Sequence, residues 1–194
     1  MEAVPERPSS GRERILETAY ELFSREGTRA VGVDRIIAAS GAAKMTLYRN
    51  FASKDALIMA FLERREERWT RGWLQAEATR RGATPAERLL AIFDVFEEWF
   101  AREDFEGCSF INVMLELARA DDPVRQASVG YLSAIRDFIR GLAEQAGVED
   151  AEGFARQWHI LMKGSIVAAA EGDREAAGRA RELGELLLAR HGLR

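Results

Sequence analysis

The chain has 194 residues, of which 47% are hydrophobic and 31% charged, and its formal net charge is −4. No apolar run approaches the roughly 18 residues of a membrane span, no signal peptide opens the sequence, and a single cysteine excludes an internal disulfide framework. These features predict a cytoplasmic protein with one large domain or a small domain joined to a larger one.

Helical spacing of apolar residues, without alternating Val, Ile or Thr runs, predicts an all-α fold of about nine helices. Ser9 or Ser10 is the expected cap of the first helix, and Gly27 ends it. Gly41 makes a tight turn before the third helix, and Ser53 caps a long fourth helix. The first three helices are expected at about residues 10–25, 33–39 and 42–50.

The rest of the chain keeps the helical pattern. Thr84-Pro85 and Pro123 are typical helix starts, and Gly147 is a typical helix end. These signals predict five more helices at about residues 85–101, 107–119, 123–147, 151–170 and 174–190.

Five segments near the N-terminus share one recognisable order and spacing: Ile15–Ala19, Leu22-Phe23, Gly27, Val33–Ile36 and Gly41–Lys54. They resemble the TetR family of bacterial transcriptional regulators. The resemblance implies a three-helix DNA-binding head with a helix-turn-helix, followed by a helical bundle. We therefore expect a flexible tail at residues 1–10, a DNA-binding domain at 11–54 and an effector-binding and dimerisation domain at 55–194.

Charge and position support DNA binding independently. Residues 1–54 carry 9 Lys and Arg against 7 Asp and Glu, whereas the remainder carries 19 against 25. The N-terminal residues of a recognition helix contact base edges, and cations near a helix start contact phosphates. The predicted DNA contacts are Lys44, Met45, Thr46, Tyr48, Arg49, Asn50 and Lys54. Gly32, Ala43 and Asn50 depart from the family's usual residues, which leaves the operator sequence open.

The family resemblance also implies a homodimer formed by the last two helices of each chain. One apolar stripe on these helices is the predicted interface: Trp158, Leu161, Ser165, Ala169, Ala180, Leu183 and Leu187. The alternative is that the stripes of both helices face the core of the monomer. Each helix also carries a second apolar edge, which favours the dimer.

An apolar or planar effector is expected in the aromatic-rich body. The candidate ligand contacts are Trp69, Trp73, Phe96, Phe110, Asn112, Met114 and Tyr131. Core packing is the alternative for each aromatic residue, and a backbone carbonyl is the alternative partner of Asn112. Cys108 and His159 are interpreted as structural residues, because no spacing typical of a metal or catalytic site occurs.

The function predicted from these patterns is a ligand-responsive DNA-binding regulator. It would repress transcription by binding a palindromic operator as a homodimer in the bacterial cytoplasm, and a small apolar effector would release it. No cofactor, metal or enzymatic activity is expected. A helical small-molecule sensor without DNA binding is the alternative, and activation in place of repression stays open.

Overall fold

The computed structural model describes residues 10–193, so most of the predicted tail (residues 1–9) lies outside the described part. Within this part the chain is helical and contains no strand, which confirms the predicted fold class. The elements are α1 Gly11–Glu26, α2 Val33–Ser40, α3 Lys44–Asn50, α4 Lys54–Arg65, η1 Glu66–Gln75, α5 Ala76–Arg81, α6 Pro85–Phe100, α7 Ser109–Glu116, α8 Pro123–Gln145, α9 Ala151–Ala170 and α10 Ala176–Arg190.

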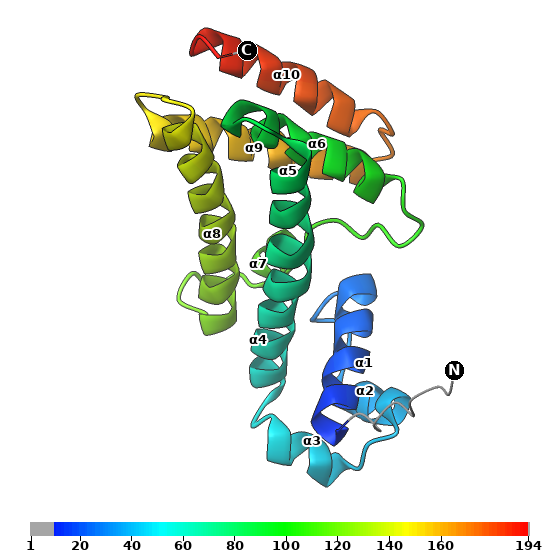
Figure 1. Ribbon diagram of the computed structural model, residues 1–194. Coiled ribbons are helices and arrows are strands. Elements are labelled where there is room, and N and C mark those ends of the chain that lie inside the picture. The colour runs from blue at the N-terminus through cyan, green and yellow to red at the C-terminus, as the bar shows by residue number, and fades with distance from the viewer. Residues whose placement is uncertain (1–9, 194) are drawn as a thin grey trace, which may run out of the picture.

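The three short helices α1 to α3 form a head at one end of the molecule (Figure 1). Their apolar faces meet around Ile15, Ile36 and Leu47, which are fully buried. The α4 helix completes this core, because the Phe61 ring packs edge-on against Phe23 at a centroid distance of 5.6 Å. Burial of such side chains stabilises the head by about 1.5–3 kcal/mol each.

A single rod formed by α4, η1 and α5 joins the head to the body (Figure 1). The sequence predicts one regular helix here, but the middle of the rod is a π-helix, whose hydrogen bonds span five residues in place of four. Gly72 permits this geometry, since a Cβ atom at this position would lie 2.7 Å from the carbonyl oxygen of Glu67. Such segments are frequent at functional sites.

Capping residues set most of the helix ends. Ser10 and Ser53 accept backbone N–H groups at the starts of α1 and α4. Thr84 and Glu87 form a reciprocal capping box at the start of α6. Asp122 caps α8 through two backbone N–H groups.

Several helix boundaries differ from the sequence prediction. The third helix begins at Lys44, because Ala43 has an extended backbone after the turn. The α7 helix covers only Ser109–Glu116 in place of 107–119, and its last carbonyl accepts a hydrogen bond from Arg29 of the head. The α10 helix begins at Ala176, since the two preceding residues form a turn.

The body consists of α6 to α10: α6, α9 and α10 lie across the far end of the rod, whereas α7 and α8 lie beside it (Figure 1). Its centre is aromatic: the Trp158 ring is fully buried, stacks on Phe154 and lies 5.3 Å from the Phe93 ring. This core fixes α9 between α8 and α10 and thereby decides which faces of α9 and α10 stay exposed.

Candidate DNA-binding surface and ligand sites

The α2 and α3 helices form a helix-turn-helix at the end of the head. Gly41 has a φ of 63°, the left-handed conformation that glycine adopts without a steric cost, and it turns the chain sharply after α2. Leu47 on the inner side of α3 is fully buried, which fixes the helix against its neighbours. The opposite side of α3 therefore faces outward at the tip of the molecule (Figure 1).

The outward side of α3 exposes apolar and cationic side chains together. Met45 and Tyr48 are 65% and 47% exposed, and Lys44 and Arg49 are also exposed. The Lys44 ammonium lies 3.5 Å from the carboxylate of Asp34, but both side chains are largely in solvent. A surface pair of this kind contributes little to stability, so Lys44 is free to exchange its partner for a base or a phosphate.

The remaining predicted DNA contacts are less exposed or already bonded. The amide of Asn50 donates to the Thr46 carbonyl oxygen at 2.7 Å, which turns it back onto its own helix. Thr46 is half-buried, and its methyl group lies beside Gly11 at the start of α1. Lys54 is half-buried in the first turn of α4, directly after the Ser53 cap.

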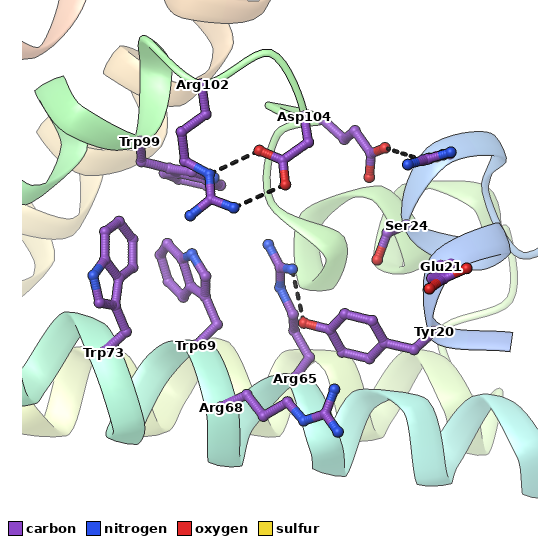
Figure 2. A pocket seen from close by; sticks show the side chains of 12 residues that line it. Tyr20, Glu21, Ser24, Arg65, Arg68, Trp69, Trp73, Trp99, Arg102 and Asp104 are labelled. Atoms are coloured by element: carbon purple, nitrogen blue, oxygen red, sulfur yellow. Dashed lines mark hydrogen bonds and ion pairs between the residues drawn. The ribbon is translucent and has the colours of Figure 1, made fainter. Parts of the chain in front are cut away.

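A cleft of about 310 Å³ lies between the head and the body, bounded by α1, the end of α4, η1 and the α6–α7 loop (Figure 2). Figure 2 shows Trp69 and Trp73 rising from the rod and Arg102 reaching down from the loop. The complete lining is Tyr20, Glu21, Ser24, Arg25, Arg65, Arg68, Trp69, Trp73, Trp99, Arg102, Asp104 and Glu106.

A second, much smaller cavity of about 10 Å³ lies inside the body, and it has room for about one water molecule. His159 and Lys163 from α9 meet its apolar wall. Burial lowers the pKa of His159 to about 3 and also lowers the pKa of Lys163, with nearby cations adding to both effects. Burial raises the pKa of Cys108 in the same lining, so its thiol stays protonated. The other lining residues are Trp69, Phe96, Ile111, Leu132, Ile135, Met162 and Ile166.

The predicted ligand contacts divide between these hollows and the packed core. Trp69 lines both hollows, Trp73 lines the cleft, and Phe96 lines the cavity. The other predicted contacts line neither: Phe110, Asn112, Met114 and Tyr131.

Packing and capping explain the positions of these four residues. The buried Phe110 ring stacks on Tyr131 at 5.1 Å, and Met114 packs against the core. The Asn112 amide donates to the Glu106 carbonyl oxygen, so a backbone group is its partner. The sequence interpretation also missed the arginines of the cleft, although Arg65, Trp69 and Trp73 are four residues apart and suggest one shared face.

The predicted dimer stripe requires a correction. Trp158, Ser165 and Ala180 are at most 5% exposed, because they pack into the core of their own protomer and cannot reach a second chain. Leu161, Ala169 and Leu187 are half-buried, whereas Leu183 is 51% exposed.

The other apolar edge of the same two helices faces solvent. On α9, Ile160 and Val167 are 66% and 49% exposed, and on α10 Leu186 is 68% exposed beside Leu183. Exposed apolar residues gathered in this way are typical of a surface that contacts another molecule. The sequence shows both apolar edges of these helices, but it does not show which edge packs into the core.

Comparison with known proteins gives two family matches that together cover most of the chain. The family of bacterial regulatory proteins named tetR matches residues 15–61. The tetracyclin repressor-like C-terminal domain matches residues 85–183. The chain belongs to the TetR family. It is therefore a DNA-binding transcriptional regulator, and the resemblance of its N-terminal segments is confirmed.

Individual TetR relatives agree over nearly the full length. A TetR transcriptional regulator from Streptomyces avermitilis is 30% identical, with a TM-score of 0.86 over 96% of this chain and 100% of that chain. A TetR-family transcriptional regulator from Streptomyces coelicolor is 28% identical, with a TM-score of 0.87 over 95% and 91% of the two chains. The transcriptional regulator AcuR of Cereibacter sphaeroides is 26% identical over 86% of this chain and 84% of its own length.

Family membership also bears on catalysis, because TetR proteins are transcriptional regulators and not enzymes. Among residues 10–193, no group of three or more His, Cys, Asp and Glu side chains is arranged to hold a metal ion. No helix of the same residues is long and apolar enough to span a membrane.

Proposed function

We propose that this TetR protein is a ligand-responsive repressor that binds a palindromic operator as a homodimer in the bacterial cytoplasm. The observation that carries the proposal is the outward side of α3, where Lys44, Met45, Tyr48 and Arg49 are exposed beyond a buried Leu47. A helix placed in this way enters the major groove with its N-terminal residues at the base edges. Lys44 then donates to guanine and Met45 contacts a thymine methyl group.

The proposed DNA-binding domain is residues 11–54, and residues 55–194 form the proposed effector and dimerisation domain. Phosphate contacts are assigned to Tyr48, Arg49 and Lys54, and a smaller contribution to Thr46 and Asn50, whose present hydrogen bond would have to open. Neutralised phosphates release counterions, so the operator affinity should fall steeply with salt.

The exposed apolar edge of α9 and α10 supports the dimer. Ile160, Val167, Leu183 and Leu186 lie on two adjacent helices, so pairing with a second copy would form a four-helix bundle. A two-fold symmetric pair places two recognition helices in successive major grooves, roughly 34–36 Å apart, and so requires a palindrome. The proposed effector site is the aromatic interior of the body, where Trp69 and Phe96 line the small cavity, which would have to widen to admit more than one water molecule.

Direct contacts between head and body support regulation by that effector. The backbone and hydroxyl of Thr28 both donate to the carboxylate of Glu116 at the end of α7. An effector that shifts α7 or η1 therefore moves the head relative to its copy in the dimer. A coupling free energy of about 1–3 kcal/mol weakens operator binding roughly 5- to 150-fold.

The deciding experiment selects bound duplexes from random DNA with the purified full chain at two salt concentrations. An enriched palindrome bound with a steep salt dependence is the expected result. Arg49→Gln should reduce the affinity and the salt slope, whereas Arg119→Gln, an exposed change in the α7–α8 loop, serves as the matched control. If no sequence were enriched and binding stayed weak at low salt, the chain would be a sensor that does not bind DNA.

A further inference from the structure

We propose that the cleft between α1, η1 and the α6–α7 loop binds a planar aromatic molecule that carries a single anionic group. This site is separate from the small cavity inside the body and does not depend on DNA binding. Its ligand would touch the head and the body at the same time, because Tyr20 comes from α1 and Trp99 from α6 (Figure 2).

The aromatic wall of the cleft is built from three tryptophans. Trp69 and Trp73 are half-buried, four residues apart on the π-helix, and their ring centroids are 5.9 Å apart. The Trp99 ring closes the wall from α6 at 4.6 Å from Trp69. Indole faces and edges bind flat rings by offset or edge-to-face contact, so this wall selects a planar, apolar body.

The anion is assigned to Arg65, the arginine of the lining that forms no ion pair with a carboxylate among residues 10–193. Arg25, Arg68 and Arg102 each pair with a carboxylate, which belongs to Glu106, Glu17 and Asp104 respectively. Arg65 donates to the Tyr20 hydroxyl at 3.0 Å, and no carboxylate of residues 10–193 lies within ion-pair distance of it.

The position of Arg65 favours an anion attached to an aromatic ring. Its guanidinium lies 5.5 Å from the Trp69 ring centroid and 5.9 Å from the Tyr20 ring centroid. A planar guanidinium held between aromatic rings keeps its outer N–H groups in a fixed fork, which matches a carboxylate or a sulfonate. The anion would thus sit at Arg65 while the ring of the same molecule rests on Trp69 or Trp73.

Two further polar atoms in the lining await a partner. The Oγ atom of Ser24 and the Nε1 atom of Trp69 are buried without a hydrogen bond among the described residues. Buried polar atoms are nearly always hydrogen-bonded in folded proteins, and both of these atoms belong to residues that line the cleft. A volume of about 310 Å³ lies at the small end of the range for ligand pockets and suits a molecule of one or two fused rings.

The acids of the lining restrict the charge of the ligand. Asp104 is neutralised by Arg102, and Glu106 faces Arg25. Burial raises the pKa of Glu106 above its usual value, while the nearby Arg25 and Arg65 oppose the shift, so this acid already has cations beside it. Glu21 is exposed, so solvent and salt screen its charge. A ligand with one negative charge is therefore favoured over a dianion.

Calorimetric titration of the full chain with 2-naphthoate, compared with the neutral 2-naphthylmethanol, tests the proposal without DNA. The expected result is at least 10-fold tighter binding of the anion than of the alcohol. Arg65→Gln should remove this preference, whereas Arg119→Gln, a loss of the same charge at an exposed loop, should leave both affinities unchanged. Equal binding of the two probes to the natural chain would overturn the anion site.

Two more variants locate the site and keep the test decisive if Arg65→Gln does not fold. Lys163→Met removes the cation of the internal cavity and should not change naphthoate binding. If it abolished binding while Arg65→Gln did not, the anion would bind in the cavity and the proposal would be wrong. Trp73→Leu shortens the aromatic wall and should weaken both probes about 5-fold or more. This variant decides the outcome if Arg65→Gln fails to fold, because unchanged affinity for both probes would then refute the cleft.

Discussion

The guanidinium of Arg64 in α4 donates two parallel hydrogen bonds of 2.6 and 2.8 Å to the Glu13 carboxylate of α1. Glu17, one turn further along α1, accepts a third bond from the same arginine. These bonds hold the pKa of Glu13 below its usual value. They tie the first helix of the head to the rod that enters the body.

Arg64→Met should lower the free energy of unfolding by about 1–2 kcal/mol, because it removes both hydrogen bonds to Glu13 while only 14% of the Arg64 side chain faces solvent. Glu17 keeps its partner Arg68 in this variant. Urea unfolding followed by circular dichroism measures the change. Arg119→Gln, which breaks a fully exposed pair, is the control and should leave the midpoint unchanged. Equal midpoints for the natural chain and Arg64→Met would show that these hydrogen bonds contribute nothing to stability.

Lys44→Gln should change sequence preference more than overall affinity. Lys44 sits at the first position of α3, where side chains reach base edges, whereas Arg49 lies in the last turn and is assigned to the DNA phosphates. Selection from random DNA should therefore show relaxed preference at one base pair per half-site for Lys44→Gln. Arg49→Gln should weaken all sequences equally. If Lys44→Gln kept the natural consensus, the assignment of Lys44 to a base would be incorrect.

Thr70→Val should raise the free energy of unfolding by about 1 kcal/mol. Thr70 is fully buried on η1, and its hydroxyl has no hydrogen-bond partner among the described residues. Replacing an unpaired buried hydroxyl with a methyl of the same shape removes a desolvation cost. Ser128→Ala is the contrasting variant and should lower the free energy of unfolding, because the buried Ser128 hydroxyl donates to the Val124 carbonyl oxygen. A destabilised Thr70→Val protein would mean that this hydroxyl is satisfied in solution.

The head could be predicted from the sequence because its signals are local and agree with one another. Gly41 determines the turn, Ser53 the next helix start, and Leu47 the buried side of the recognition helix. Each depends on residues a few positions away, so periodicity and capping are sufficient to find it.

The rod and the ligand sites could not be predicted in the same way. The π-helical turn arises from the close approach of Gly72 to the Glu67 carbonyl, and an α-helical period cannot reveal it. The cleft joins Tyr20, Arg65 and Arg102 from three distant segments. Which edge of α9 enters the core depends on tertiary packing of Trp158, since both edges are apolar in the sequence.

Leu186→Glu should convert the proposed dimer into a monomer. Leu186 is 68% exposed on α10, and burying a carboxylate there against a second apolar copy costs several kcal/mol. Sedimentation velocity measures the mass, and binding to a full palindrome should weaken at least about 100-fold while binding to a half-site persists. Leu115→Glu, at a 71% exposed position of α7, is the matched control and should remain dimeric. Dissociation by both variants, or by neither, would place the interface elsewhere.

His159 should make the protein less stable in mild acid. Its side chain is 4% exposed, and burial together with Lys163 and Arg136 lowers its pKa from 6.5 to about 3. Between these values the unfolded chain takes up a proton that the folded chain excludes, so stability is complete above pH 6.5 and declines as the pH falls towards 3.

Urea unfolding at pH 7 and pH 5 should therefore show a loss of about 1–2 kcal/mol from this residue, since each unit of pH below 6.5 costs about 1.4 kcal/mol. His159→Gln should remove most of that loss, because glutamine does not titrate. His191→Gln, at a half-buried position after α10, is the control and should retain the pH dependence of the natural chain. If His159→Gln kept the full loss between pH 7 and pH 5, carboxylates rather than the buried imidazole would account for it.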